Sequence, residues 1–201
     1  MKHSSRYLKF LQLAALALLA IGIPSLAYAH AGIGHASGLA HGFAHPIGGL
    51  DHVCAMLAVG VWAAQMGGRA AWLVPLTFVT VMALGGALGM AAVPLAYTEQ
   101  GIVMSLLVLG VLITVAVRLP LAVSAAVVGV FALCHGYAHG AEMPQDASGL
   151  AYAAGFILST ALLHASGIGI ALLAGKTGRA EWLRLAGVAI TLCGGGLLFA
   201  G

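Results

Sequence analysis

Long apolar stretches alternate with short polar segments along most of this chain. Each stretch is close to the roughly 20 residues that a helix needs to cross the core of a bilayer. After the first 29 residues there are six such stretches, at about 44–66, 70–93, 101–117, 121–140, 150–174 and 182–200. The pattern predicts an all-α, polytopic membrane protein with six transmembrane helices.

The composition agrees with a membrane setting. Hydrophobic residues make up 62% of the 201 residues and charged residues only 6%, whereas about 25% are charged in a typical soluble domain. The 8 basic and 5 acidic side chains are too few to cover the surface of a soluble protein of this length. A soluble globular fold is therefore disfavoured.

Glycine is abundant, with 29 residues. In lipid, small residues let helices approach one another closely. The spacings Gly85-x-x-x-Gly89 and Gly136-x-x-x-Gly140 therefore predict a compact bundle rather than a flexible chain.

The N-terminal 29 residues have the pattern of a secretory signal peptide. Three basic residues precede an apolar run that ends at the small-residue motif Ala27-Tyr28-Ala29. We expect cleavage after Ala29, which divides the chain into a signal peptide at 1–29 and a six-helix transmembrane domain at 30–201. Cleavage would leave five basic and five acidic residues, so the formal net charge of +3 is no sign of nucleic-acid binding. The alternative is an uncleaved anchor helix, and both readings place the following residues on the outer side.

The charges between the spans predict a topology, because cytoplasmic loops of membrane proteins are enriched in Lys and Arg. Basic residues fall in alternate loops and acidic residues in the others: Arg69, Arg118, Lys176 and Arg179 against Glu99, Glu142 and Asp146. Only Glu181, beside Arg179, is an acid on the basic side, and acids weigh little in this rule. We therefore expect a multi-pass membrane protein with both ends of the mature chain on the outer side.

Two polar clusters interrupt the apolar pattern. Three of their members come from the first span and three from the fourth: His45, Asp51 and His52, and His135, His139 and Glu142. The first span enters from the outside and the fourth returns to it, so both clusters are expected at a similar depth. Asp51 and His52 would lie roughly 10 Å inside the helix end, at 1.5 Å per residue.

The spacing within each cluster predicts a shared helix face, because residues four, seven and eleven positions apart lie on one side of an α-helix. The two predicted stripes are His45, His52 and Met56, and His135, His139 and Glu142. Pro46 suits the first turn of a helix, which would place His45 in the capping region. Gly48 and Gly49 would let a neighbouring helix or an ion approach the backbone.

Asp51 is the strongest indication of function in these clusters. A carboxylate inside a bilayer is costly unless it is paired or faces a cavity. Imidazole together with carboxylate suits borderline divalent metals such as nickel, cobalt and zinc. Asp51 either binds the metal directly or orients a ligating imidazole. For each histidine taken alone, the alternative is an ordinary hydrogen-bonded core residue, and for Glu142 it is a solvated loop acid.

Two motifs carry a resemblance to a known family: His45-Pro46-x-x-Gly49-x-Asp51-His52 and His135-Gly136-x-x-His139-Gly140-x-Glu142. Together with the signal peptide, the helix count and the order of the motifs, they resemble the HupE/UreJ family of hydrogenase and urease accessory membrane proteins. The likeness spans the mature chain.

This resemblance implies a nickel permease of the bacterial inner membrane, with its mature N-terminus in the periplasm, that supplies the maturation of hydrogenase or urease. It carries the metal-site role onto five of the six residues: His45, Asp51, His52, His139 and Glu142. The role of His135 depends on the spacing argument. The implied partners are a divalent metal ion, membrane lipid and the maturation proteins, with no nucleic acid. Nickel, or cobalt or zinc, is expected as the bound or transported ion, with no prosthetic group and no catalytic residue.

Other residues have weaker signals. His30, His35 and His41 fall in a Gly- and Ala-rich stretch, where a linker is favoured over a metal-chelating tail. The three cysteines are odd in number and lack C-x-x-C spacing, so no disulfide framework is expected. Cys54, Cys134 and Cys193 are interpreted, like Met56, as packing residues. Met56 with Cys54 and Cys134 leaves a soft-ligand copper site as an alternative.

Two further polar residues allow two interpretations each. His164 lies about 14 residues into the fifth span, roughly 21 Å along the helix. It is either an inner relay site or the donor of a helix-packing hydrogen bond. Glu99 either attracts cations at the outer mouth or is a solvated loop charge.

Two other functions use similar residues. An intramembrane zinc hydrolase would hold its metal with histidines and an aspartate and attack with a metal-bound water. A haem protein would use facing histidines such as His52 and His135 as axial ligands. Transport without catalysis is favoured. The sequence lacks a GxxxxGK[ST] phosphate loop, so we expect facilitated diffusion or secondary transport.

Overall fold

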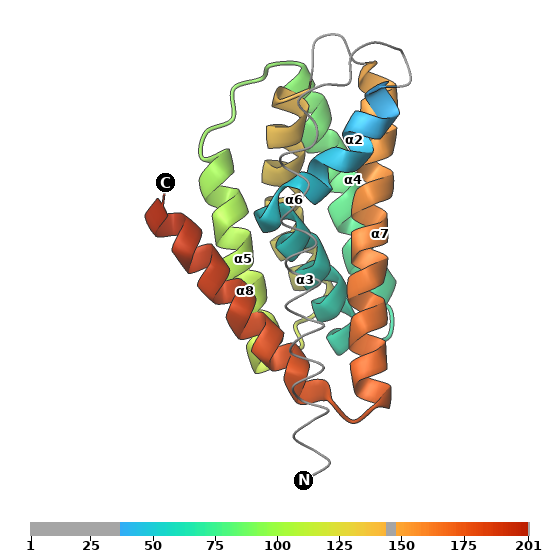
Figure 1. Cartoon of the computed structure of the whole chain (residues 1–201), viewed down its shortest axis with the longest axis vertical. Coiled ribbons are helices and arrows are strands. Elements are labelled where there is room, and N and C mark those ends of the chain that lie inside the picture. The colour runs from blue at the N-terminus through green and yellow to red at the C-terminus, as the bar shows by residue number, and fades with distance from the viewer. Residues whose placement is uncertain (1–36, 144–147, 201) are drawn as a thin grey trace. The chain divides into compact units, whose positions relative to one another are not determined.

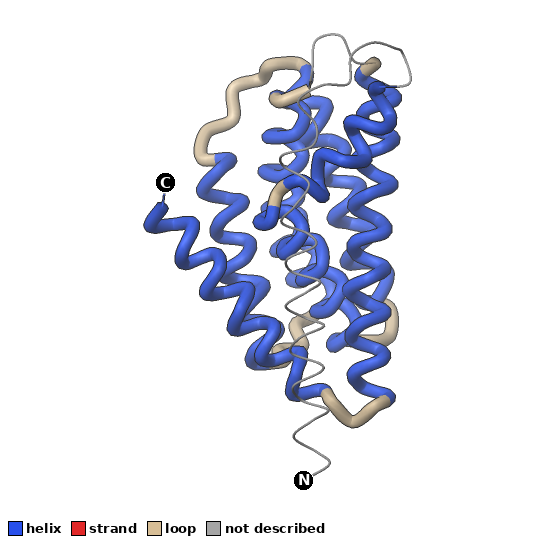
Figure 2. The backbone as a smooth tube through the Cα atoms, viewed as in Figure 1, coloured by secondary structure: helices blue, strands red, loops and turns tan. Residues whose placement is uncertain are grey.

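The computed structural model describes residues 37–143 and 148–200, and within these ranges every regular element is an α-helix. The helices, shown in Figure 1, are α2 (Ser37–Gly48), α3 (Leu50–Met66), α4 (Ala70–Met90), α5 (Thr98–Val115), α6 (Leu121–Ala141), α7 (Gly149–Lys176) and α8 (Ala180–Ala200). Figure 2 shows the loops that join them. The all-α class is confirmed, and the predicted signal peptide lies outside the described residues.

Five of these helices, α4 to α8, are each long and apolar enough to cross a membrane. Helices α2 and α3 make a sixth candidate span if they are counted as one, although they meet at an angle of 83°. The break between them lies inside the bundle rather than at its end (Figure 1). The predicted count of six is therefore reached only when a bent pair of helices counts as one span.

The prediction of one continuous first helix is wrong. Helix α2 begins at Ser37 and contains Pro46 close to its C-terminal end, so the proline precedes the end of one helix instead of opening another. A proline inside a helix removes a backbone donor and clashes with the preceding turn, and Gly48 and Gly49, which follow it, have low helix propensity. Helix α3 then starts at Leu50.

This break also overturns two smaller predictions. His45 lies on α2, whereas His52 and Met56 lie on α3, so the three do not form a stripe on one helix face. His41 lies within helix α2 rather than in a linker. His30 and His35 lie outside the described residues.

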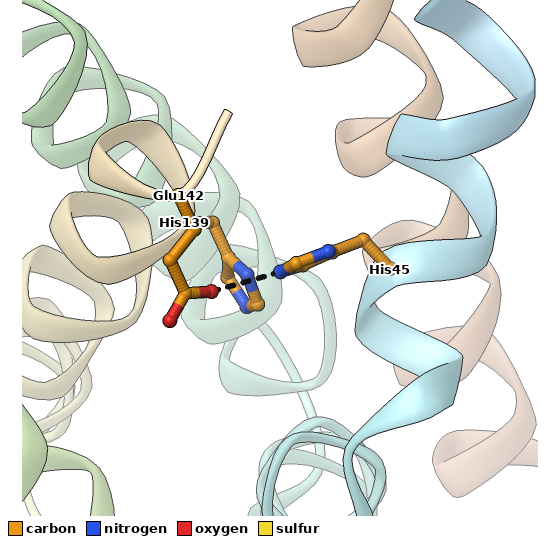
Figure 3. Close-up of side chains that lie close together, drawn as sticks. All are labelled: His45, His139 and Glu142. Carbon is orange, nitrogen blue, oxygen red and sulfur yellow. Dashed lines mark hydrogen bonds and ion pairs between the residues drawn. The ribbon is translucent and has the colours of Figure 1, made fainter. Parts of the chain in front are cut away.

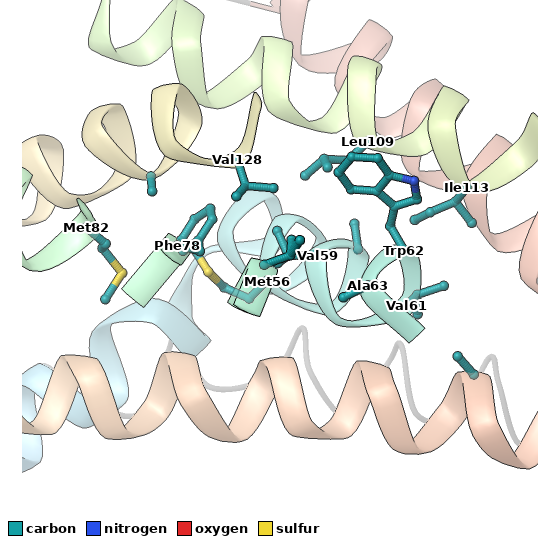
Figure 4. Packing of buried hydrophobic residues seen from close by; sticks show 14 of the residues in the cluster. Met56, Val59, Val61, Trp62, Ala63, Phe78, Met82, Leu109, Ile113 and Val128 are labelled. Atoms are coloured by element: carbon teal, nitrogen blue, oxygen red, sulfur yellow. The ribbon is translucent and has the colours of Figure 1, made fainter. Parts of the chain in front are cut away.

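Helix α3 is the centre of the helix packing. It contacts α4, α5, α7 and α8, and nine of its 17 residues are buried, including every residue from Ala58 to Ala63. The core packed around it combines α3 with its neighbours (Figure 4), and includes Met56, Val59, Trp62, Phe78, Leu109, Ile113 and Val128. The Trp62 indole donates a hydrogen bond to the Val117 carbonyl oxygen at 2.9 Å, so its buried polar atom is satisfied. The interpretation of Met56 as a packing residue is confirmed.

Glycines on α4 and α6 let these two helices pack backbone to backbone. An added Cβ at Gly136 would overlap the Met82 carbonyl, and one at Gly140 would overlap the Gly86 carbonyl. An added Cβ at Gly89 would likewise overlap the Tyr137 carbonyl. This close approach confirms the packing role predicted from the glycine spacing, and it holds the C-terminal end of α6 in place.

The adjacent glycines Gly85 and Gly86 test this packing. A Cβ at position 85 would lie 2.5 Å from the Leu133 carbonyl oxygen, whereas one at position 86 would lie 3.5 Å from the nearest atom, an ordinary contact. We expect Gly85→Ala to destabilise the purified protein by about 1–3 kcal/mol, because backbone atoms must move. Gly86→Ala should leave the unfolding transition in detergent unchanged or raise it. Equal transitions for the two variants would contradict the packing argument.

Candidate metal centre

The six predicted site residues meet where the ends of three helices converge. The C-terminal end of α2 supplies His45, and the first turn of α3 supplies Asp51 and His52. The last turns of α6 supply His135 and His139, and Glu142 follows directly after them. The structure thus brings together side chains that are up to 97 positions apart in the sequence.

The outer part of this group consists of His45, His139 and Glu142, which we call the outer triad. His45 Nε2 donates a hydrogen bond to Glu142 Oε2 at 3.0 Å, and the rings of His45 and His139 lie 4.6 Å apart. Figure 3 shows His45 reaching across from α2 to His139 on α6 and to Glu142 just beyond the end of α6. Glu142 is thus paired with a histidine and is not a free loop acid.

The ligand atoms of the outer triad are close enough to share one ion. They lie within 4.8 Å of one another. Ligands bound at about 2.1 Å on opposite sides of an ion lie about 4.2 Å apart, so small side-chain rotations would close the site. The side chains of His45 and Glu142 are 34% and 57% exposed, whereas His139 is 3% exposed. The triad therefore leads from solvent to the interior.

Asp51 and His52 form a pair at the start of α3. His52 Nδ1 donates to Asp51 Oδ1 at 2.9 Å. With the proton held on Nδ1, the lone pair lies on His52 Nε2, which is buried and has no hydrogen-bond partner. A carboxylate that fixes the tautomer of an imidazole in this way is the usual arrangement behind a metal-binding histidine. Of the two predicted roles of Asp51, the geometry favours orientation of His52.

Gly49 makes room for this pair. An added Cβ at that position would lie 2.7 Å from Asp51 Oδ1 and 2.9 Å from His52 Nδ1, both shorter than real contacts. At Gly48, by contrast, an added Cβ would meet nothing within 4 Å. The helix break at Gly49 therefore serves the site, because the two side chains fold back over the backbone there.

His135 is oriented by a residue that the sequence analysis missed. The Ser105 hydroxyl on α5 donates to the Ile102 carbonyl at 2.6 Å and lies 3.1 Å from His135 Nε2, so it accepts the proton of that nitrogen. The lone pair is then on His135 Nδ1, which is buried without a partner. Ser105 is a small polar residue within an apolar span, and such residues more often bond to their own helix.

Three imidazoles meet with free nitrogen atoms. The ring of His52 lies 4.9 Å from that of His135 and 4.2 Å from that of His139, and neither ring nitrogen of His139 has a hydrogen-bond partner. Buried polar atoms without partners are rare and costly. A cation bound between these rings would satisfy them. The metal-binding role of the six residues stays a prediction, and this set of free nitrogens fits it.

Helix α7 forms a wall of the site that was not predicted. The ring of Tyr152 lies 5.9 Å from that of His45, and the ring of Phe156 lies 4.2 Å from that of His139. A cavity of about 50 Å³ lies beside His139, Tyr152 and Phe156, bounded on the other side by Met82 of α4. That volume accommodates at least one water molecule.

The other candidate residues lie outside this centre or do not form a ligand set. All three cysteines are free, as expected from their spacing. Glu99 is exposed in the first turn of α5. His52 and His135 contact each other edge to face, which leaves no space for a haem between them.

Comparison with known proteins identifies the family. The HupE / UreJ protein family model matches residues 16–197. The chain is also 46% identical over 182 residues to Protein HupE of Rhizobium leguminosarum bv. viciae, an alignment that covers 90% of this chain and 94% of the relative. No solved structure matches the chain. The chain belongs to the HupE/UreJ family.

Proposed function

We propose that this protein is an inner-membrane facilitator that carries nickel inward for the maturation of hydrogenase or urease. Membership of the HupE/UreJ family supports a metal-transport role connected with these enzymes. The observation that carries the proposal is the group of free, buried imidazole nitrogens on His52, His135 and His139, adjoining the partly exposed outer triad.

The outer triad captures the ion. Glu142 is the most exposed of the three and offers a negative charge at the entrance. On binding, the ion takes the place of the hydrogen bond between His45 and Glu142. The proton on His45 Nε2 passes to Nδ1 through solvent, so that Nε2 and the Glu142 carboxylate can both bind the ion. His139 belongs to this triad and also contacts His52, so it passes the ion inward without a gap.

The interior site replaces the water molecules that the ion loses. Taking a dication out of water is costly unless charge and ligands compensate. The nitrogens of His52, His135 and His139 supply ligands, and Asp51 supplies a second negative charge beside them. Together Asp51 and Glu142 match the two positive charges of the ion.

The membrane potential is sufficient to drive inward movement. A dication crossing a potential of 100 mV, negative inside, gains about 4.6 kcal/mol, at about 2.3 kcal/mol per charge. This supports a concentration ratio of roughly a thousand, since each 1.4 kcal/mol is a factor of ten. The proposal therefore needs no ATP, provided that the convergence of α2, α3 and α6 faces the periplasm.

Uptake by proteoliposomes tests the proposal. Vesicles that contain the purified protein should accumulate nickel faster than empty vesicles, and an inside-negative potential should increase the rate. Comparison with cobalt and zinc at equal concentrations defines the cargo. Uptake no faster than in empty vesicles for all three ions would refute transport, and hydrolysis of a lipid or amide by the same sample would instead support the zinc hydrolase.

Acidification should slow this uptake. Imidazole must be neutral to bind a metal, and free imidazole takes up a proton at about pH 6.5. With the same pH on both sides of the vesicle membrane, we expect the rate to fall as pH is lowered from about 7.5 to about 5.5. A rate that does not change over this range would contradict ligation by histidine.

A further inference from the structure

Helix α7 carries a second group of buried polar side chains, beyond the candidate metal centre. Ser159 is 1% exposed, Thr160 is 0% exposed and His164 is 2% exposed. Both ring nitrogens of His164 and the hydroxyl oxygens of Ser159 and Thr160 are buried without a hydrogen-bond partner. The predicted helix-packing hydrogen bond of His164 is therefore not formed. Four buried polar atoms within six residues need an explanation.

The free hydroxyls of Ser159 and Thr160 are unusual within this protein. Elsewhere, serine and threonine hydroxyls in the helices bond to the carbonyl one turn earlier, which satisfies them within their own helix. This applies to Thr77, Thr80, Thr114, Ser166, Thr177 and Thr191. Ser166 is on the same helix as the two exceptions. The hydroxyls of Ser159 and Thr160 are thus available to a ligand.

His164 is separated from the candidate metal centre by one aromatic ring. Phe78 of α4 lies 5.8 Å from His135 and 5.1 Å from His164, measured between ring centroids, and stands perpendicular to the His164 ring. Along α7, His164 follows Phe156, which contacts His139, by eight residues, or about 12 Å. His164 therefore continues the series of histidines deeper into the bundle.

The main chain at His164 is held against α3. An added Cβ at Gly60 would overlap the His164 carbonyl, and one at Gly167 would overlap the Leu57 carbonyl. These two glycines let α3 and α7 pack closely on both sides of this position. The backbone of His164 thus lies against α3 while its ring lies against Phe78 of α4.

We propose that His164, with the hydroxyl of Thr160 one turn earlier on the same face of α7, is a second and deeper binding station for the divalent ion. This proposal rests on the proposed transport function. The ion passes from His135 to His164 when Phe78 turns aside, because Phe78 touches both rings. One imidazole and one hydroxyl suit a borderline ion that keeps most of its water. The station has no carboxylate, so it binds the ion more weakly than the candidate metal centre does. Weak binding allows the ion to leave along an exit path.

Replacement of His164 by leucine tests the station. Leucine fills a similar volume and removes both unpartnered nitrogens, so the melting temperature of the purified protein should be unchanged or higher. Nickel uptake by proteoliposomes should fall at least about tenfold. Equilibrium binding of nickel to the purified protein reports the candidate metal centre, and its affinity should stay within about twofold of that of the unmodified protein. Ser166→Ala, an exposed position on the same helix, is the control and should transport normally.

The outcomes separate the station from the transport function. Uptake by His164→Leu within about twofold of the unmodified protein would overturn the station and leave the transport function intact. Failure of the unmodified protein to take up nickel would refute the transport function itself. If His164→Leu does not fold, His164→Gln decides, because glutamine can form hydrogen bonds but is a poor ligand for nickel: lost uptake supports the station and normal uptake overturns it.

Discussion

Asp51→Asn should lose most nickel uptake while the protein still folds. Asparagine has nearly the same size and its side-chain oxygen can still accept the hydrogen bond from His52 Nδ1, which is 2.9 Å long in the unmodified protein. The substitution removes only the negative charge. Because that charge offsets the lost hydration of a dication and raises the basicity of His52, we expect uptake to fall roughly 10- to 100-fold.

The measurement is the uptake rate per folded molecule in proteoliposomes. Glu181→Gln is the control, because it removes an exposed acid at the start of α8 and should leave uptake unchanged. The opposing view, in which Asp51 only stabilises the helix break, predicts less folded protein but normal uptake per molecule. That result would remove the charge of Asp51 from the mechanism.

Gly49→Ala should reduce uptake to a similar degree, roughly 10- to 100-fold, although it alters no ligand. Its Cβ would lie 2.7 Å from Asp51 Oδ1 and 2.9 Å from His52 Nδ1. These are side-chain atoms that can rotate away, so the backbone remains folded while the pair is displaced. The ring of His52 then no longer lies against the rings of His135 and His139.

Gly48→Ala is the matched control for this experiment. It makes the same chemical change one residue earlier, where an added Cβ meets nothing within 4 Å. Uptake by Gly48→Ala should remain normal. If the two variants transport equally well, the precise placement of the Asp51–His52 pair does not matter for transport.

Much of the helical architecture could be predicted from the sequence, because a chain in lipid must satisfy its backbone hydrogen bonds within helices. The predicted spans from residue 70 onward overlap α4 to α8 closely. The break between α2 and α3 could not be predicted in the same way. Proline favours the first turn of a helix, and Pro46 fits that position in the sequence as well as it fits the end of α2 in the structure.

The sequence predicted those site residues that are ionisable and therefore unfavourable in lipid. It missed those whose residue types are common in membrane helices. Asp51 and the paired histidines stand out from an apolar background, so their types and spacing indicated a metal site. Ser105, Tyr152 and Phe156 have no such signal, because serine and aromatic residues commonly pack inside membrane helices. Only the fold shows that Ser105 fixes the ring of His135, or that Phe156 lies against His139.

The central claim is that histidine nitrogens at the convergence of α2, α3 and α6 bind the transported ion. X-ray absorption at the nickel edge, on the purified protein with one equivalent of nickel, tests it most directly. The account predicts nitrogen and oxygen ligands with the scattering of two or more imidazole rings, and a loss of imidazole scattering in His52→Ala. A fully hydrated ion, or sulfur ligands from the free cysteines, would contradict it.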